Sequence, residues 1–154
     1  MTVNLVDDQP RGFDQNSVVA LAEMVLAEEG FASETVVDIT ALTEEAIAEL
    51  NRVHLGRTGP TDVLSFPLEL LEPGAVPAVA LGGPPLHLGD LVIAPEYVAG
   101  QAERYGVAFE DELALMVVHG LLHLMGWDHR LDEEAEAMEA RERALLAKVG
   151  VERR

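Results

Sequence analysis

Hydrophobic and polar positions along the chain follow two periods, one typical of strands and the other typical of helices. Short β-branched or apolar runs predict four strands, at residues 3–6, 35–40, 63–66 and 88–94. Apolar residues at helical spacing predict five helices, at residues 16–30, 43–53, 95–106, 110–125 and 132–150. Because helices lie between most of the strands, this order predicts an α/β (α+β) fold. We expect a single domain over residues 1–154, with a four-stranded mixed sheet and about five helices packed with it.

Residues with known preferences for helix ends mark where several of these helices begin. Asn16 or Ser17 is expected to cap the first helix, since a short polar side chain accepts hydrogen bonds from free backbone N–H groups. By the same argument Thr43 caps the second helix and Asp132 caps the last. Pro95 suits the first turn of the third helix, where its missing N–H is not needed.

The two C-terminal helices differ in how they are expected to pack. The helix at 110–125 is apolar nearly all round, which is typical of a helix at the buried centre of a fold. The last helix is amphipathic, and its acidic residues between 133 and 142 are expected on a solvated face. Four apolar residues of that helix are expected to face the core: Ala135, Met138, Leu145 and Leu146.

A segment rich in proline and glycine separates the third and fourth strands. Residues 67–87 hold five of the eight prolines and three glycines. This composition predicts a long loop, or a hairpin excursion, that is too short to link two domains.

Charge and cysteine content exclude several classes of protein. The chain has 28 acidic and 10 basic residues and a net charge of −18, which argues against a protein that coats nucleic acid through its phosphates. It has no cysteine, and this removes disulfides, iron–sulfur clusters, thiol nucleophiles and cysteine-ligated zinc fingers. We find neither a signal-peptide pattern nor an apolar run of about 18 residues, so we expect a soluble, cytoplasmic protein without a membrane partner.

Three of the five histidines lie at a spacing that suits one metal ion. His119 and His123 are four residues apart on the apolar helix, about 40° around it and about 6 Å along it. Gly126 can end the helix and turn the chain, so that His129 folds back as a third ligand. Three imidazoles with an open fourth position are typical of catalytic zinc, so we expect one Zn²⁺ per chain. The alternative is that these are core histidines satisfied by hydrogen bonds. Burying two polar rings on the most apolar helix costs free energy unless such partners are present.

The same spacing, H-x-x-x-H-x-x-G-x-x-H, occurs in metzincin proteases. Their second residue is a glutamate that acts as the general base, and here that position is Gly120. A metalloprotease is therefore the less favoured alternative.

Further motifs accompany the histidines in the expected order along the chain. They are Leu50-Asn51, residues 59–67 (GPTDVLSFP), residues 88–93 (LGDLVI) and residues 110–114 (EDELA). Together with residues 119–129, this set resembles the YbeY family of metal-dependent endoribonucleases that act in bacterial ribosomal RNA maturation. The resemblance implies zinc on the three histidines and cleavage of single-stranded RNA near the 3′ end of small-subunit ribosomal RNA. It also implies a role in ribosome quality control, with the small ribosomal subunit and its assembly factors as partners and no role on DNA.

One departure from that family concerns a cation. The family commonly carries an arginine where this chain has Leu55, and leucine cannot pair with a phosphate. Arg57 and Arg130 are the candidates to replace it, while Arg52 lies further back on its helix. The net charge of −18 favours, as an alternative, a zinc-stabilised ribosome assembly factor with weak or no catalysis.

The residues beside the third histidine each have two readings. Asp128 is a candidate base or a residue that orients a ligand, but the more favoured reading is a turn aspartate bonded to its own backbone. Trp127 either stacks on a base or packs in the core, and packing is favoured. Residues 153–154 are expected to be a frayed tail, and His54 and His87 are expected to be solvated.

Overall fold

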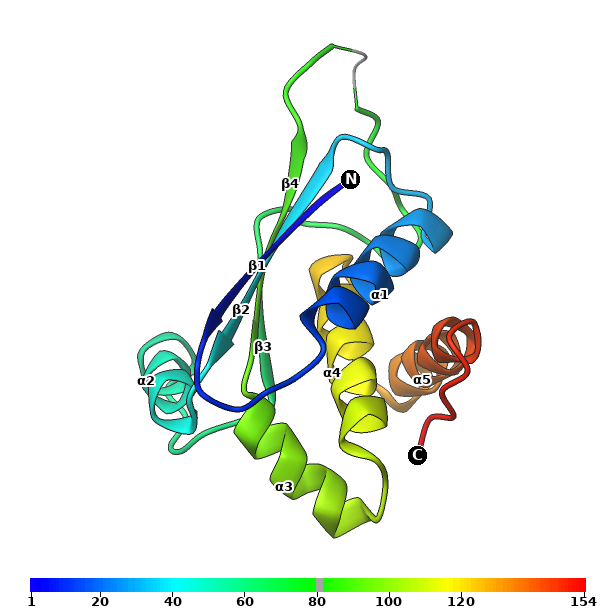
Figure 1. Cartoon of the computed structure of the whole chain (residues 1–154). Coiled ribbons are helices and arrows are strands. Elements are labelled where there is room, and N and C mark those ends of the chain that lie inside the picture. The colour runs from blue at the N-terminus through cyan, green and yellow to red at the C-terminus, as the bar shows by residue number, and fades with distance from the viewer. Residues whose placement is uncertain (80–81) are drawn as a thin grey trace.

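The computed structural model describes residues 1–79 and 82–154, and its centre is one four-stranded sheet (Figure 1). The strand order is β1-β2-β4-β3, in which β1 and β2 and then β2 and β4 run parallel, while β3 and β4 run antiparallel. The sheet is therefore mixed, as the sequence predicts. The strands are β1 (Thr2–Asp8), β2 (Thr35–Leu42), β3 (Val63–Pro67) and β4 (Leu86–Ile93).

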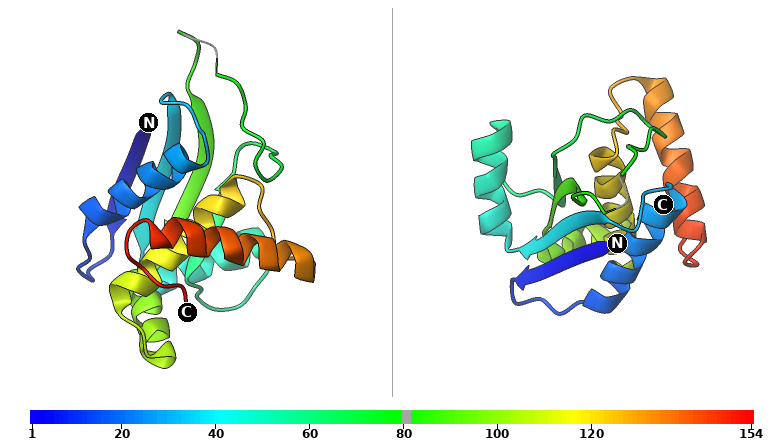
Figure 2. Two further views of the ribbon diagram at one scale, coloured as in Figure 1. Left: turned by 90° about the vertical axis from the view of Figure 1, so that its right-hand side faces the viewer. Right: turned by 90° about the horizontal axis from the view of Figure 1, so that it is seen from above.

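Five helices cover the sheet unequally. They are α1 (Gln15–Glu28), α2 (Glu44–Leu55), α3 (Pro95–Tyr105), α4 (Phe109–Leu124) and α5 (Asp132–Ala147). Figures 1 and 2 show α1, α4 and α5 on one side of the sheet and α2 on the other. The expected α/β architecture in a single domain, with a four-stranded mixed sheet and five helices, is confirmed.

The main core explains why α4 is apolar nearly all round. This helix lies between the sheet and α5, and it also contacts α1 and α3, so that most of its surface is buried. A smaller core on the opposite face joins Ile47 of α2 to Leu64, Val92 and Ala94. Helix α4 is therefore the element that places side chains between the sheet edge and α5.

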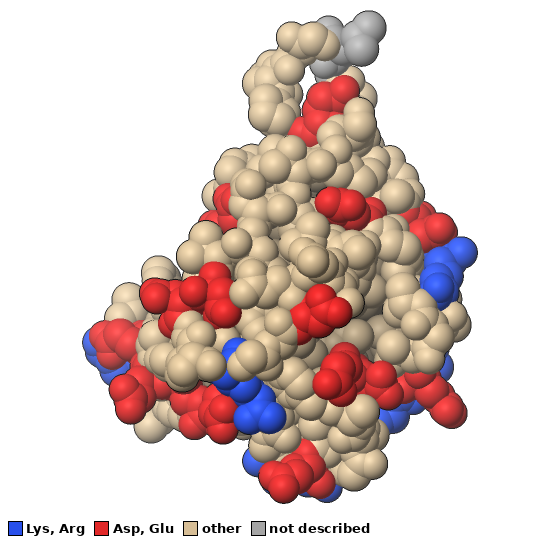
Figure 3. Space-filling view, viewed as in Figure 1, with Lys and Arg blue, Asp and Glu red and all other residues tan. Residues whose placement is uncertain are grey.

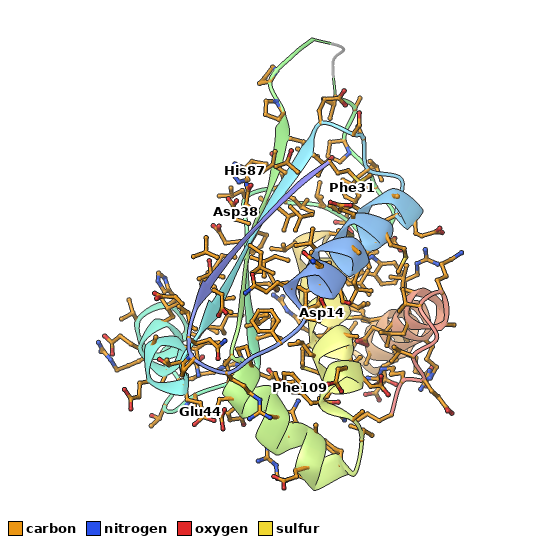
Figure 4. The ribbon with its side chains drawn as sticks, in the orientation of Figure 1. Asp14, Phe31, Asp38, Glu44, His87 and Phe109 are labelled. Atoms are coloured by element: carbon orange, nitrogen blue, oxygen red, sulfur yellow. The ribbon has the colours of Figure 1, made fainter. Side chains whose placement is uncertain are left out.

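The helix caps agree with the sequence only in part. Thr43 caps α2 as expected, accepting from the backbone N–H of Ala46 at 3.2 Å. The prediction for α1 is wrong, because the cap is Asp14 (Figure 4), whose carboxylate accepts from the backbone N–H of Ser17 at 3.0 Å. Asp14, two residues before Asn16 and three before Ser17, therefore does what either of them was expected to do.

One further expectation, about the start of the last helix, is also wrong. Asp132 is the first residue of α5 rather than its cap, and Leu131 at the cap position makes no side-chain bond. Val53 on α2 is 58 % exposed. Helix α2 packs on the sheet through Ile47 and Leu50, so Val53 is left outside the small core.

The segment between β3 and β4 is a hairpin excursion, since it joins two antiparallel neighbours. Residues 80 and 81 of this predicted loop lie outside the described residues. Leu71, near its start, packs against the main core, so this part of the loop borders the end of α4. Within the part of the chain that the structure describes, we find no helix long and apolar enough to cross a membrane.

Candidate metal centre

His119, His123 and His129 converge at one place, as their spacing predicts. Each offers one ring nitrogen, and these three atoms lie within 4.8 Å of one another. The ring centroids are 4.5 Å apart for His119 and His123, 5.5 Å for His119 and His129, and 5.0 Å for His123 and His129. His119 and His123 are partly buried, whereas His129 is exposed. The cluster is therefore open to solvent on one side.

A tight turn at Gly126 returns the chain toward α4. Its φ of +97° is a conformation that residues with a side chain rarely adopt. The backbone N–H of Trp127 donates to the carbonyl of Leu122 at 3.0 Å and closes the turn. A Cβ at Gly126 would lie 2.1 Å from the carbonyl oxygen of Leu71. Only glycine fits here, and this turn brings His129 beside the two helical histidines.

The hydrogen-bond partners of the ring nitrogens set which nitrogens of His119 and His123 are free to bind a cation. Nδ1 of His123 lies 2.9 Å from the carbonyl oxygen of Trp127, an acceptor only, so this Nδ1 carries the proton. Nδ1 of His119 lies 3.1 Å from Oε2 of Glu142. The two Nε2 atoms face each other at 3.0 Å. With both Nδ1 atoms donating, two lone pairs point into one space, and a metal ion there would satisfy both.

Burial and charge favour the form of the site that binds a metal. Burial lowers the pKa of His123 below its ordinary value, and the neighbouring His119 lowers it further. A neutral imidazole is the form that binds a metal ion. The lowered pKa therefore keeps His123 able to bind a metal ion at lower pH than an ordinary histidine. The backbone N–H of His129 lowers the pKa of Asp128, and Arg130 adds to this effect. Asp128 therefore stays ionised beside the third histidine.

Gly120 lies at a close approach between α4 and the sheet. A Cβ there would lie 2.2 Å from Cδ1 of Leu91 and 3.0 Å from Cγ2 of Val63. The hydroxyl of Ser65 on β3 donates to the carbonyl of Gly120 at 2.8 Å and fixes this contact. A side chain at this position would require Leu91 and Val63, both packed in the main core, to shift, so the glutamate of a metzincin protease fits poorly here. This packing counts further against the protease alternative.

The histidines border a cleft of about 870 Å³ between β3, α4, α5 and the loops that follow α2 and β3. Leu55, Arg57, Asp128 and Arg130 all line this cleft. Arg52 is not among the lining residues, and it is paired with Glu49 on its own helix. The structure thus brings the predicted cations Arg57 and Arg130 to the same cleft as the histidines.

The residues beside the cluster and the two remaining histidines have distinct surroundings. Asp128 accepts from the backbone N–H of His129 at 2.8 Å, the local bond that the favoured turn interpretation predicts, and it pairs with Arg130 at 2.8 Å. Its part as a base or as a residue that orients a ligand stays a prediction. Trp127 packs against the main core, also as favoured, and its buried Nε1 has no hydrogen-bond partner among the described residues. His54 and His87 are exposed as expected. His87 pairs with Asp38 on the side of the sheet opposite α1 (Figure 4).

Two expectations about charged residues are wrong. Glu142 is not on a solvated face, since its side chain is 1 % exposed and contacts His119. Arg153 and Arg154 are not a frayed tail, because both line the cleft and both pair with buried glutamates, Arg153 with Glu142 and Arg154 with Glu112. The burial of Glu142 could have been predicted from its position on the apolar stripe of α5, four residues after Met138 and three before Leu145.

Comparison with known proteins agrees with this geometry. A family model described as Endoribonuclease YbeY matches residues 6–150. The chain belongs to the endoribonuclease YbeY family. It is 43 % identical over 136 residues to the Endoribonuclease YbeY of Symbiobacterium thermophilum, covering 88 % of this chain and 85 % of that protein. It is also 43 % identical over 147 residues to that of Moorella thermoacetica, covering 95 % and 94 %.

A solved structure supports the same assignment. The solution structure of TM1509 from Thermotoga maritima matches with a TM-score of 0.59 and 25 % identity, covering 96 % of this chain and 91 % of that one. The YbeY-family resemblance seen in the motifs is therefore confirmed over nearly the whole chain. Family membership supports a nuclease activity and an RNA substrate class.

Proposed function

We propose that this YbeY-family chain is a zinc-dependent endoribonuclease that cleaves single-stranded RNA. The observation that carries the proposal is the pair of Nε2 atoms that face each other at 3.0 Å while their Nδ1 atoms are held by acceptors. His129 adds the third nitrogen and leaves a fourth position open to the cleft. A set of three neutral imidazoles suits Zn²⁺, one ion per chain.

The residues around the cluster divide the work of binding and orienting a phosphodiester. A zinc ion held by the three histidines would supply Lewis acidity toward a phosphoryl oxygen, so that no glutamate is needed on the helix. Arg57 and Arg130 line the cleft and can pair with the phosphate of the substrate. Asp128 lies between Arg130 and the backbone of His129, where it holds both in place.

The RNA target proposed is the 3′ end of small-subunit ribosomal RNA, with a role in ribosome quality control. The support is the family assignment together with an open cleft suited to a flexible single strand. The small ribosomal subunit and its assembly factors are then the partners, in the cytoplasm, and DNA is not a substrate.

One observation favours a second candidate, a zinc-stabilised assembly factor with little catalysis. The net charge is −18, and acidic side chains are spread over the face drawn in Figure 3, with few basic ones among them. Naked RNA binds such a surface weakly, whereas a ribosomal particle could supply contacts of its own.

The decisive experiment loads the purified protein with zinc and offers it single-stranded RNA, duplex RNA and casein. The first proposal expects cleavage of the single strand only, and loss of both zinc and cleavage in His123→Ala. Full zinc with no cleavage of any RNA would favour the assembly factor. A precursor of small-subunit ribosomal RNA with extra 3′ nucleotides, beside a scrambled strand of equal length, tests the target.

A second arm tests the replacement cation. Arg57→Ala should lower cleavage about ten- to a hundredfold, or about 1.4–2.7 kcal/mol of transition-state stabilisation, with zinc content unchanged. Arg52→Ala is the matched control, because Arg52 is exposed but lies outside the cleft lining. Normal cleavage by both Arg57→Ala and Arg130→Ala would remove arginine from the mechanism.

A further inference from the structure

Two buried glutamates in the cleft region offer a natural comparison. Glu112 is on α4 and Glu142 is on α5, and each side chain is 1 % exposed. Arg154 donates Nε and Nη2 to Glu112 at 2.7 and 2.9 Å, and Nε of Arg153 lies 3.4 Å from Oε1 of Glu142. The two pairs are alike in burial and in the type of partner. They differ in two respects. Glu112 accepts two hydrogen bonds from Arg154 and another from Gln101 at 2.7 Å, whereas the contact between Arg153 and Glu142 is an ion pair without a hydrogen bond. Glu142 contacts a histidine, and Glu112 contacts none among the described residues.

The contact between Glu142 and His119 fixes which ring nitrogen can bind a metal. A carboxylate only accepts hydrogen bonds, so with Oε2 at 3.1 Å the Nδ1 of His119 carries the proton. The lone pair is then on Nε2, the nitrogen that faces His123 at 3.0 Å. Glu142 lies on the Nδ1 side of the ring, so it acts on the ligand and is not a ligand itself.

We propose that Glu142 is a positioning residue of the metal centre and that Arg153 holds its carboxylate in place. This inference rests on the metal centre proposed above. Hydrogen-bond partners behind a ligating histidine set its tautomer and ring orientation, and their loss typically costs about ten- to a hundredfold in metal affinity. Burying a carboxylate costs free energy of folding, and this role gives a reason for the burial of Glu142.

Arg153 is held mainly by contacts within the protein, although its buried Nε makes an ion-pair contact with Glu142 and no hydrogen bond. Besides the contact with Glu142, its Nη1 donates to the carbonyl of Arg154 at 2.8 Å, and its Nη2 lies 3.8 Å from Glu139. Its side chain is 17 % exposed. Such a guanidinium supports Glu142 better than it could meet a substrate phosphate, which distinguishes Arg153 from Arg57 and Arg130.

The test compares Glu142→Gln and Glu142→Leu with Glu112→Gln and Glu112→Leu. Zinc affinity is measured by competition with a chromophoric chelator, and the folding of each metal-free variant by far-UV circular dichroism and thermal unfolding. Glu142→Gln should bind zinc about ten- to a hundredfold more weakly than wild type, and Glu142→Leu more weakly still, because glutamine keeps an acceptor oxygen. Both Glu112 variants should bind zinc within about twofold of wild type, whatever their stability.

A spectroscopic measurement reads the tautomer without any metal. In two-bond ¹H–¹⁵N spectra, His119 of the metal-free wild type and of Glu112→Leu should show a protonated Nδ1, and this signature should be lost in Glu142→Leu. Equal zinc affinity in the Glu142 and Glu112 variants, or an unchanged tautomer in Glu142→Leu, overturns the role of Glu142. A wild type that binds no zinc overturns the metal centre as well, so the two failures are distinguishable.

Arg153→Ala and Arg154→Ala separate positioning from simple charge. Removal of a cation near a dication should by Coulomb's law strengthen metal binding. If Arg153 positions Glu142, Arg153→Ala instead weakens zinc binding, by less than Glu142→Gln does, while Arg154→Ala leaves it unchanged. Tighter or unchanged zinc binding in Arg153→Ala overturns the part assigned to Arg153.

Discussion

Replacement of Gly126 by alanine should damage the protein in two separable ways. A residue with a Cβ pays about 1–2 kcal/mol in the left-handed region, and Gly126 has a φ of +97°. The new Cβ would also lie 2.1 Å from the carbonyl oxygen of Leu71, so one of the two backbones must move by about 1 Å to reach ordinary contact. Steric overpacking of this kind costs about 1–3 kcal/mol. Together these give a loss of about 2–5 kcal/mol.

Gly106→Ala is the control that isolates the steric part. Gly106 ends α3 with a φ of +68°, and a Cβ there would meet nothing within 4 Å. It should therefore lose only about 1–2 kcal/mol for the left-handed conformation. At about 2–4 °C per kcal/mol for a chain of this size, Gly126→Ala should melt about 2–12 °C below Gly106→Ala.

The assay combines thermal unfolding of the metal-free proteins with zinc titration. The chain must shift at Gly126, three residues before His129, so Gly126→Ala should also bind zinc more weakly, whereas Gly106→Ala should bind it normally. If the two variants melted together and bound zinc equally, the close approach to Leu71 would not be what positions the third histidine.

Three further predictions concern packing, pH and salt. Gly120→Glu should fail to fold by circular dichroism rather than gain protease activity, because its Cβ would lie 2.2 Å from Leu91 and its carboxylate would be buried; a folded variant that cleaves casein would refute this. The metal-free protein should lose stability in urea as the pH falls below about 6.5, because the pKa of His123 is lowered on folding and the unfolded chain binds the proton first. His123→Gln should flatten that dependence, and an unchanged slope would contradict the assignment. RNA affinity should fall only shallowly with salt, and a thousandfold loss between low and moderate salt would show an extended basic surface.

The local parts of this structure were predictable from sequence because they depend on short spacings. His119 and His123 are brought together by one turn of helix, and Gly126 with His129 by the next few residues. The order of strands and helices follows from the spacing of apolar residues, which repeats about every 2 residues in a strand and about every 3.6 residues in a helix. In each case the residues that decide the outcome lie within a few positions of one another.

The support behind the histidines was not predictable in the same way. Glu142 meets His119 across 23 positions, and Arg154 meets Glu112 across 42. Such contacts depend on how α5 and the following residues pack over α4, which periodicity does not specify. The place of Glu142 on the apolar stripe of α5 points to its burial, but it does not say which residue the buried carboxylate meets.

The pairing of charges in the cleft decides which arginine can replace the one missing at Leu55. Among the residues that the structure describes, four arginines line the cleft, but Arg153 and Arg154 are paired with buried glutamates. Arg130 pairs with Asp128 at 2.8 Å, and 84 % of its side chain is exposed. Arg57 makes no ion pair with any described residue, and it lines the cleft two positions after Leu55. A cation without a competing carboxylate loses least when it turns to a phosphate, so Arg57 is the residue whose loss should cost cleavage most.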